Sequence, residues 1–173
     1  MLNGLKQFVP SSVCLACDGC CRFKEKDSVW RPRITQEEIA RKNKPDLLSV
    51  IYAKENVDAQ GYLKTTSCGD GPHLCSFFSA PENACTIYDA RPFECRLYPF
   101  VLIKKDNCAA IAAHHACPFI QEKRHDDQFE KYVGYLKGFF EKKEVREFLK
   151  RNPSMAGEYK DYENELEYLF TVL

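Results

Sequence analysis

Cysteine is the residue type with which this sequence is best equipped to do chemistry. Residues 14–21 read CLACDGCC and hold four of the ten cysteines of the 173-residue chain. The first three follow a C-x2-C-x2-C pattern, in which two-residue spacers let a tight loop bring neighbouring thiolates onto one metal or cluster. A lone C-x2-C is more typical of zinc, whereas the repeated spacing is typical of loops that hold a 4Fe–4S cluster. The pattern therefore indicates a metal site and leaves zinc and iron open.

Cysteines and histidines elsewhere in the chain are further candidate ligands. Ferredoxin-type sites take a ligand from a remote cysteine followed by proline, and Cys117 precedes Pro118. Cys68 and Cys108 lie outside any close spacing, so core packing is the simpler interpretation for both. His73 and His115 each lie two residues before a cysteine and are weaker candidates. The sequence leaves open whether these last four residues contribute ligands.

Composition and charge exclude several classes of function. The 25 basic and 25 acidic residues balance, and no basic cluster suggests binding to nucleic acid or to a membrane surface. No stretch approaches the roughly 20 apolar residues of a membrane span, and residues 1–12 lack the apolar centre of a signal peptide. We therefore expect a cytoplasmic protein without a nucleic-acid or membrane partner. The reducing cytoplasm disfavours disulfides, so ten cysteines there indicate metal or redox chemistry.

Two helices are predicted between the first and second groups of cysteines. Thr35 is followed three residues later by Glu38, a capping-box pattern that begins a helix. Pro45 ends this helix, and Asp46 caps a second one that is over by Gly61. The apolar residues at helical spacing in the second helix are Leu47, Leu48, Ile51 and Tyr52.

The middle cysteines fall on a predicted hairpin and a short helix. Residues 75–88 read CSFFSAPENACTIY, in which a Pro-Glu-Asn turn separates two short strands. Cys75 would lie on one strand and Cys85 on the other. Pro92 would then begin a short helix that holds Cys95.

Helices are also predicted in the last third of the chain. Residues 126–150 carry an apolar stripe and end before Asn152-Pro153. Residues 158–170 are predicted to form a second helix, and the alanine-rich residues 109–118 suggest a further one. The apolar stripe predicts packing, with a docking surface for a protein partner as the alternative. The expected fold is α-rich with a small β-hairpin and an irregular cysteine-rich metal-binding core, a small α+β fold. We expect a cysteine-cluster domain over residues 1–125 and a helical extension packed on it over residues 126–173.

Taken together, these motifs resemble the YkgJ-type cysteine-cluster family, the CxxCxxCC domain that is described as chelating zinc or iron. The resemblance is carried by CLACDGCC and by C-x9-C-T-I-Y-x2-R-P-x2-C-R-x-Y-P, and it covers roughly residues 14–120. Cys117-Pro118 resembles the closing cysteine of the family, although Phe119 replaces the glycine that often follows. The resemblance implies eight metal-ligating cysteines: Cys14, Cys17, Cys20, Cys21, Cys75, Cys85, Cys95 and Cys117.

Eight thiolates suit two four-coordinate sites, or one cluster with spare thiols. Adjacent residues of an extended segment point in different directions, so we expect Cys20 and Cys21 to serve two neighbouring sites. Four thiolates around a 4Fe–4S core in its 2+ state carry a net charge of about −2. Arg91 and Arg96, which flank Cys95, are predicted to offset this charge and bind the cofactor. The alternative for either arginine is a structural ion pair at the surface.

The main functional expectation is an iron–sulfur protein with one or two clusters, 4Fe–4S favoured. Its role would be electron transfer or assistance to a partner enzyme. Some members of the family are protein lysine methylases, so the resemblance also implies a cluster-dependent methylase-like enzyme as an alternative. A zinc-stabilised binding module is the second alternative. The sequence indicates no catalytic residue and leaves substrate, redox partner and oligomeric state open.

Overall fold

The structure is a computed structural model that describes residues 4–17, 19–40, 56–67 and 69–173. The chain divides into two units: unit 1 is Met1–Val9 with Arg96–Leu173, and unit 2 is Pro10–Cys95. The expected division into residues 1–125 and 126–173 differs from these units and stays a prediction. The helix predicted after Asp46 lies outside the described residues.

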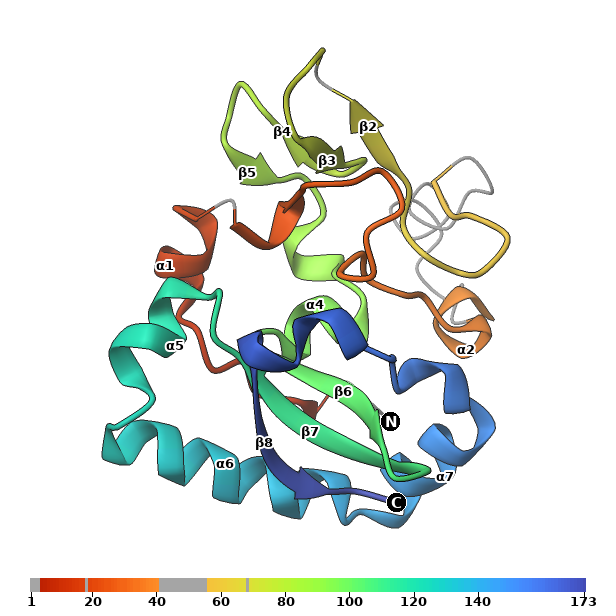
Figure 1. Ribbon diagram of the computed structural model, residues 1–173, viewed down its shortest axis with the longest axis vertical. Coiled ribbons are helices and arrows are strands. Elements are labelled where there is room, and N and C mark those ends of the chain that lie inside the picture. Colours follow the sequence, from red (N-terminus) through yellow and green to blue (C-terminus); the bar gives the residue numbers. More distant parts are fainter. Residues whose placement is uncertain (1–3, 18, 41–55, 68) are drawn as a thin grey trace. The chain divides into compact units, whose positions relative to one another are not determined.

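Unit 2 is built from short elements. Strands β1, β3 and β2 form an antiparallel sheet in that order, and β4 pairs with β5 (Figure 1). Helix α4 (Phe93–Leu97) begins in unit 2 and ends in unit 1. The other described elements are α1 (Ser11–Leu15), η2 (Gly19–Cys21), β1 (Arg22–Phe23), α2 (Gln36–Ala40), β2 (Thr65–Ser67), β3 (His73–Cys75), β4 (Phe78–Ser79), β5 (Ala84–Cys85) and η3 (Tyr88–Ala90).

The predicted capping box forms at the start of α2. The backbone N–H of Thr35 donates to Oε2 of Glu38 at 3.0 Å, and the N–H of Glu38 donates to Oγ1 of Thr35 at 3.2 Å. Each side chain thus satisfies a backbone donor that the first turn of the helix leaves free. The prediction of a helix start at Thr35 is confirmed.

The predicted hairpin is present but holds one cysteine instead of two. Phe78 pairs with Cys85 and Ser79 with Ala84, so Cys85 lies on β5 as expected. Cys75 lies instead at the end of β3, where it pairs with Thr65 of β2. The backbone of Cys75 is therefore engaged in another sheet, and the prediction that it lies on the hairpin is wrong.

Unit 1 contains a three-stranded antiparallel sheet in the order β6–β7–β8 (Figure 1). Phe100 of the sheet stacks on Phe129 with 5.8 Å between ring centroids, and Phe8 contacts both rings. This aromatic cluster forms the core between helix α6 and the sheet. The elements are β6 (Phe100–Lys105), β7 (Cys108–His114), α5 (Pro118–Lys123), α6 (Asp127–Phe140), α7 (Lys143–Arg151), η4 (Pro153–Met155), η5 (Lys160–Glu165) and β8 (Leu166–Thr171).

The single helix predicted over residues 126–150 is two helices, α6 and α7, and the spacing of apolar residues explains the break. In a continuous helix the stripe that contains Phe140 would next reach residues 143–144 and 147, which are charged. The apolar residues occur instead at Val145, Phe148 and Leu149. Restarting the helix after residue 142 lets both stripes be buried, as they are. The packing interpretation is confirmed, and a protein partner on these helices stays a prediction.

Two segments predicted as helices are strands. Residues 109–118 contribute most of β7, and residues 158–170 form η5 and β8. Ile111 pairs with Phe170 and Ala112 with Tyr168, on either side of a β-bulge. Pairing on both sides satisfies the backbone of β7, which outweighs the helix propensity of its alanines. The fold is therefore mixed α+β with more strand than the single predicted hairpin.

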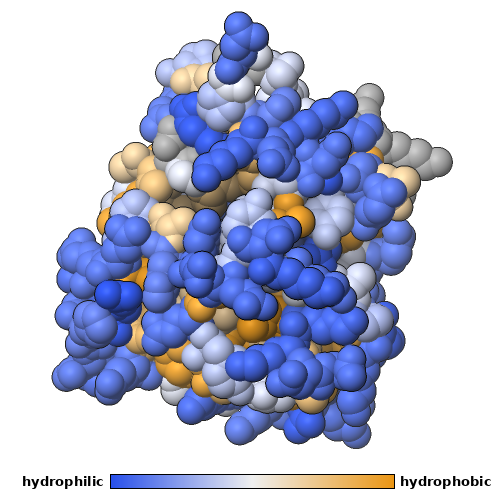
Figure 2. All heavy atoms as spheres, in the orientation of Figure 1, coloured by the Kyte–Doolittle hydropathy of each residue, from blue (hydrophilic) through white to orange (hydrophobic). Residues whose placement is uncertain are grey.

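On the face drawn in Figure 2, polar and charged side chains cover most of the surface, with apolar patches between them. No helix in the described ranges combines the length and apolarity that crossing a membrane requires.

Candidate metal centre

Six described cysteines of unit 2 interact with one another although they come from distant segments. The thiol of Cys20 interacts electrostatically with each of the other five, so Cys20 is common to the whole group. We call this group the thiol cluster. Its members lie on α1, η2, β3, β5 and α4, and they are Cys14, Cys20, Cys21, Cys75, Cys85 and Cys95.

Burial and crowding raise the pKa of these thiols. Burial raises the pKa of Cys95 well above its usual value, and the neighbouring charges of Cys75, Cys20 and Cys85 raise it further. Burial also raises the pKa of Cys75 to about 11. Because thiolates repel one another in apolar surroundings, the buried and half-buried thiols of the cluster stay protonated unless a cation takes the place of the protons. Metal binding would make that exchange.

The adjacent pair Cys20 and Cys21 is arranged differently from the sequence expectation. The segment Gly19–Cys21 is a 3-10 helix. The two thiols are hydrogen-bonded, which raises the pKa of Cys21 together with its burial. The expectation that the two side chains diverge from an extended segment is therefore wrong. Their assignment to two separate metal sites stays a prediction.

Arg91 lies beside the thiol cluster and is fixed by three contacts. Its Nε donates to the carbonyl oxygen of Tyr88 at 2.7 Å, and its guanidinium carbon lies 3.5 Å from the centroid of the Tyr88 ring. Its Nη1 donates to Sγ of Cys14 at 3.5 Å. Burial raises the pKa of Cys14, and the charge of Arg91 acts in the opposite direction. A positive charge is thus held where a thiolate would form.

The thiol cluster borders the hydrophobic core of unit 2. Cys75 is itself buried, in contact with a group that includes Phe23, Ile34 and Phe77. Cys21 and Cys85 pack against the same group. Cys20 is exposed. The thiol cluster therefore has one side in an apolar environment and one side at the surface of the unit.

Helix α4, which holds Cys95, is anchored by two carboxylates. Oε1 of Glu38 accepts the backbone N–H of Phe93 at 2.7 Å, in addition to the contacts of Glu38 with Thr35. Oε2 of Glu94 accepts the backbone N–H of Arg33 at 2.7 Å. Burial raises the pKa of Glu94 to about 7. The sequence predicted Glu38 only as a capping residue, because nothing local signals a partner 55 residues away.

The other candidate cysteines are not members of the thiol cluster. Cys17 is exposed just beyond α1. Cys117 is buried at the N-terminal end of α5 and belongs to unit 1. Cys108 is exposed at the start of β7, and Cys68 lies outside the described residues. The roles predicted for Cys17 and Cys117 stay predictions.

Three further candidates are also placed by the structure. His73 is half-buried on β3. Nε2 of His115 lies 3.0 Å from a carboxylate oxygen of Glu167, so this imidazole is engaged within unit 1. Arg96 follows Cys95 in α4 and is half-buried. Its predicted role toward a cofactor stays a prediction.

The chemistry of the donor set fits a thiophilic metal. Thiolates are soft ligands that suit zinc and iron–sulfur clusters, whereas magnesium and calcium prefer oxygen. Among the described residues, no three Cys, His, Asp or Glu side chains are already in a metal-binding arrangement. The thiol cluster is the part of the described chain that brings most of the predicted ligands together.

Comparison with known proteins identifies one family. The family model CxxCxxCC, described as "Putative zinc- or iron-chelating domain", matches residues 13–118. This range contains the whole thiol cluster and Cys117. No curated protein and no solved structure matches the chain.

Proposed function

The chain belongs to the CxxCxxCC family of zinc- or iron-chelating domains, and from this premise we propose that unit 2 holds an iron–sulfur cluster, with 4Fe–4S favoured. The observation that carries the proposal is the thiol cluster, in which six thiols share interactions with Cys20. A structural zinc site and a 4Fe–4S cluster each take four cysteine ligands, so the number of thiols around Cys20 suits either centre. The preference for iron rests on the repeated C-x2-C-x2-C spacing, which is typical of loops that hold a 4Fe–4S cluster.

Arg91 supports an anionic centre. A cluster with four thiolates carries a net charge of about −2 in its 2+ state. A guanidinium 3.5 Å from Sγ of Cys14 offsets part of that charge and donates a hydrogen bond to a ligand sulfur. Such hydrogen bonds to sulfur shift the reduction potential of a cluster. Arg91 would thus favour the more reduced state, which carries the extra negative charge.

The role proposed for this centre is electron transfer, or assistance to a partner enzyme, in the cytoplasm where thiols stay reduced. The exposed thiol of Cys20 supports exchange with a partner, because it brings the centre to the surface of unit 2. A lysine methylase-like activity stays a prediction. The zinc-stabilised binding module is the second candidate, and the description of the family favours it as much as iron.

Anaerobic purification followed by metal analysis tests the proposal. We expect brown protein with iron and acid-labile sulfide, broad absorbance near about 400 nm, and an electron paramagnetic resonance signal on reduction or oxidation. Cys85→Ser and Cys95→Ser should each lose most of the iron. Cys108→Ser is the matched control, because Cys108 is exposed and outside the thiol cluster.

The outcomes separate the two candidates. Colourless protein with stoichiometric zinc and no iron would overturn the iron–sulfur proposal in favour of the zinc module. Protein with neither metal, or iron unchanged in both Cys85→Ser and Cys95→Ser, would show that the thiol cluster is not the metal centre.

A further inference from the structure

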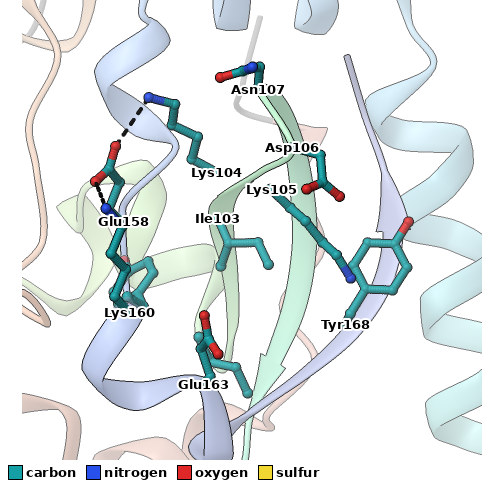
Figure 3. Close-up of a pocket in the computed structure, with 11 residues that line it drawn as sticks. Ile103, Lys104, Lys105, Asp106, Asn107, Glu158, Lys160, Glu163 and Tyr168 are labelled. Carbon is teal, nitrogen blue, oxygen red and sulfur yellow. Dashed lines mark hydrogen bonds and ion pairs between the residues drawn. The ribbon is translucent and has the colours of Figure 1, made fainter.

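A cavity of about 580 Å³ opens on unit 1, and none of the eight cysteines predicted as metal ligands lines it. It lies between the β6–β7 hairpin, the segment from Glu158 to Glu163, and strand β8 (Figure 3). Its volume is in the range of about 300–1,000 Å³ that is usual for small-molecule sites. All of its lining residues belong to one unit.

The outer strands of the sheet contribute to the lining of the cavity, and the central strand does not. Ile103 of β6 pairs with Ala110 of β7, and Ala112 of β7 pairs with Tyr168 of β8. Ile103 and Tyr168 line the cavity, whereas Ala110 and Ala112 are fully buried and lie outside its lining. The sheet therefore supplies cavity walls from β6 and β8.

One wall of the cavity is an ion-paired strip. Nζ of Lys104 lies 3.1 Å and Nζ of Lys160 lies 3.5 Å from the carboxylate oxygens of Glu158. The hydrogen bond from Lys104 and the charges of both lysines lower the pKa of Glu158. Two ammonium groups share one carboxylate, so this wall keeps one positive charge.

The rest of the cavity offers one more cation and two carboxylates. Nζ of Lys105 lies 4.0 Å from the centroid of the Tyr168 ring, and the two residues form the facing wall in Figure 3. Glu163 lies at the lower end of the cavity in that view, and Asp106 at the turn of the hairpin. Within the described ranges, neither Glu163 nor Asp106 takes part in an ion pair. Apolar surface is supplied by Ile103 and Leu166.

We propose that this cavity binds a small zwitterion with an ammonium and a carboxylate group, that is, a free amino acid or a short peptide. A ligand with only negative charge would face Glu163 and Asp106. A ligand with only positive charge would face three lysines. A zwitterion places its ammonium at Glu163 and its carboxylate at Lys105, and its apolar side chain lies against Ile103 and Leu166. The lysine over the Tyr168 ring disfavours stacking of an aromatic base on that face.

Titration of the metal-loaded full-length chain with leucyl-leucine tests the ligand class, with binding followed by calorimetry and by nuclear magnetic resonance shifts. Free leucine is the second probe and separates an amino-acid site from a peptide site. N-acetyl-leucyl-leucine and leucyl-leucine amide each lack one charge, and we expect at least tenfold weaker binding for both. Equal binding of the blocked and free forms would overturn the proposal. No binding at ligand concentrations up to about 10 mM would also overturn it, because the binding free energy would then be weaker than about 3 kcal/mol.

Variants test the site itself. We expect Glu163→Gln and Lys105→Gln each to weaken leucyl-leucine binding at least fivefold while leaving the melting temperature unchanged, since both residues are exposed. Glu144→Gln on α7 is the matched control, because Glu144 is exposed and outside the cavity. Wild-type affinity in both cavity variants would place the ligand elsewhere. The result does not depend on the metal, because the cavity lies wholly within unit 1.

Discussion

Glu38 links two helices of unit 2 through one carboxylate, and its removal should weaken both ends of that link. Its two oxygens accept the N–H and the Oγ1 hydroxyl of Thr35 at 3.0 Å each and the N–H of Phe93 at 2.7 Å. Phe93 is the first residue of α4 and lies two residues before Cys95. We therefore expect Glu38→Ala to lower both the stability of unit 2 and its hold on a metal.

The expected loss of unfolding free energy in Glu38→Ala follows from the number of buried donors that the substitution leaves without a partner. Glu38 and Thr35 are buried, and Phe93 is fully buried. A hydrogen bond to a charged group contributes about 1.5–3 kcal/mol, and a buried donor without a partner costs about 1–3 kcal/mol. Two of the three bonds share Thr35 and do not add independently. We expect Glu38→Ala to lower the free energy of unfolding by about 3–5 kcal/mol, and Glu38→Gln, which keeps one acceptor oxygen, by about half as much.

Denaturant unfolding and metal release to a chelator measure the two effects. Gln36→Ala is the matched control, since Gln36 is exposed in the same helix and should change stability by less than about 0.5 kcal/mol. Glu38→Ala should also release metal faster than the control does. A Glu38→Ala variant as stable as Gln36→Ala would refute the argument that this carboxylate joins α2 to α4. If Glu38→Ala is destabilised but releases metal no faster than Gln36→Ala, the contact of Glu38 with α4 does not affect metal binding at Cys95.

Three further predictions concern the same unit. Arg91→Gln should lower the reduction potential of the centre relative to Arg91→Lys, because it removes the positive charge beside Cys14; equal potentials in a redox titration would contradict this. Glu94 has its pKa raised to about 7 in the folded state, so it contributes stability at low pH that is lost as pH rises from about 4.5 to 7. Glu94→Gln should remove up to about 3 kcal/mol of that pH dependence, and an unchanged slope in unfolding experiments at pH 5 and 7 would count against it. Chelation of the metal should expose the amides of β3 and β5 to hydrogen exchange and leave those of β6 and β7 protected. Loss of protection in all four strands at the same time would contradict this prediction.

Local signals in the sequence predicted local structure well. The Thr35–Glu38 capping box, the turn before Cys85 and the short helix around Cys95 all depend on residues within a few positions of one another, and each is confirmed. The grouping of cysteines was visible from their spacing. The sequence does not predict that the thiol of Cys20 interacts with five other thiols, because this depends on how five separate segments come together in the fold.

Predictions failed where pairing partners are distant. The alanines of β7 have high helix propensity, but this strand pairs with β6 next to it and with β8, about 60 residues further on. Cys75 has a different explanation, because its ladder partner Thr65 is near in sequence but lies before it in the chain, on the side away from the predicted hairpin. The break between α6 and α7 can be predicted from the sequence, because the apolar residues after Phe140 no longer follow the helical spacing of those before it. A continuous helix would have exposed Phe148, which is fully buried.

The contrast between the two units bears on what a metal does in this protein. Helices α1, α2 and α4 have five residues each, and β1, β4 and β5 have two each. Helices this short are not stable alone, since about 12–15 residues are needed for marginal stability in water. Unit 1, in comparison, has a 14-residue helix on a sheet with strands of six and seven residues. The thiol cluster lies on the short elements, so a metal there would cross-link segments up to about 80 residues apart and close the loops between them. The free energy of metal binding would then contribute directly to the folding of unit 2. The same cysteines would bind the metal and stabilise the unit.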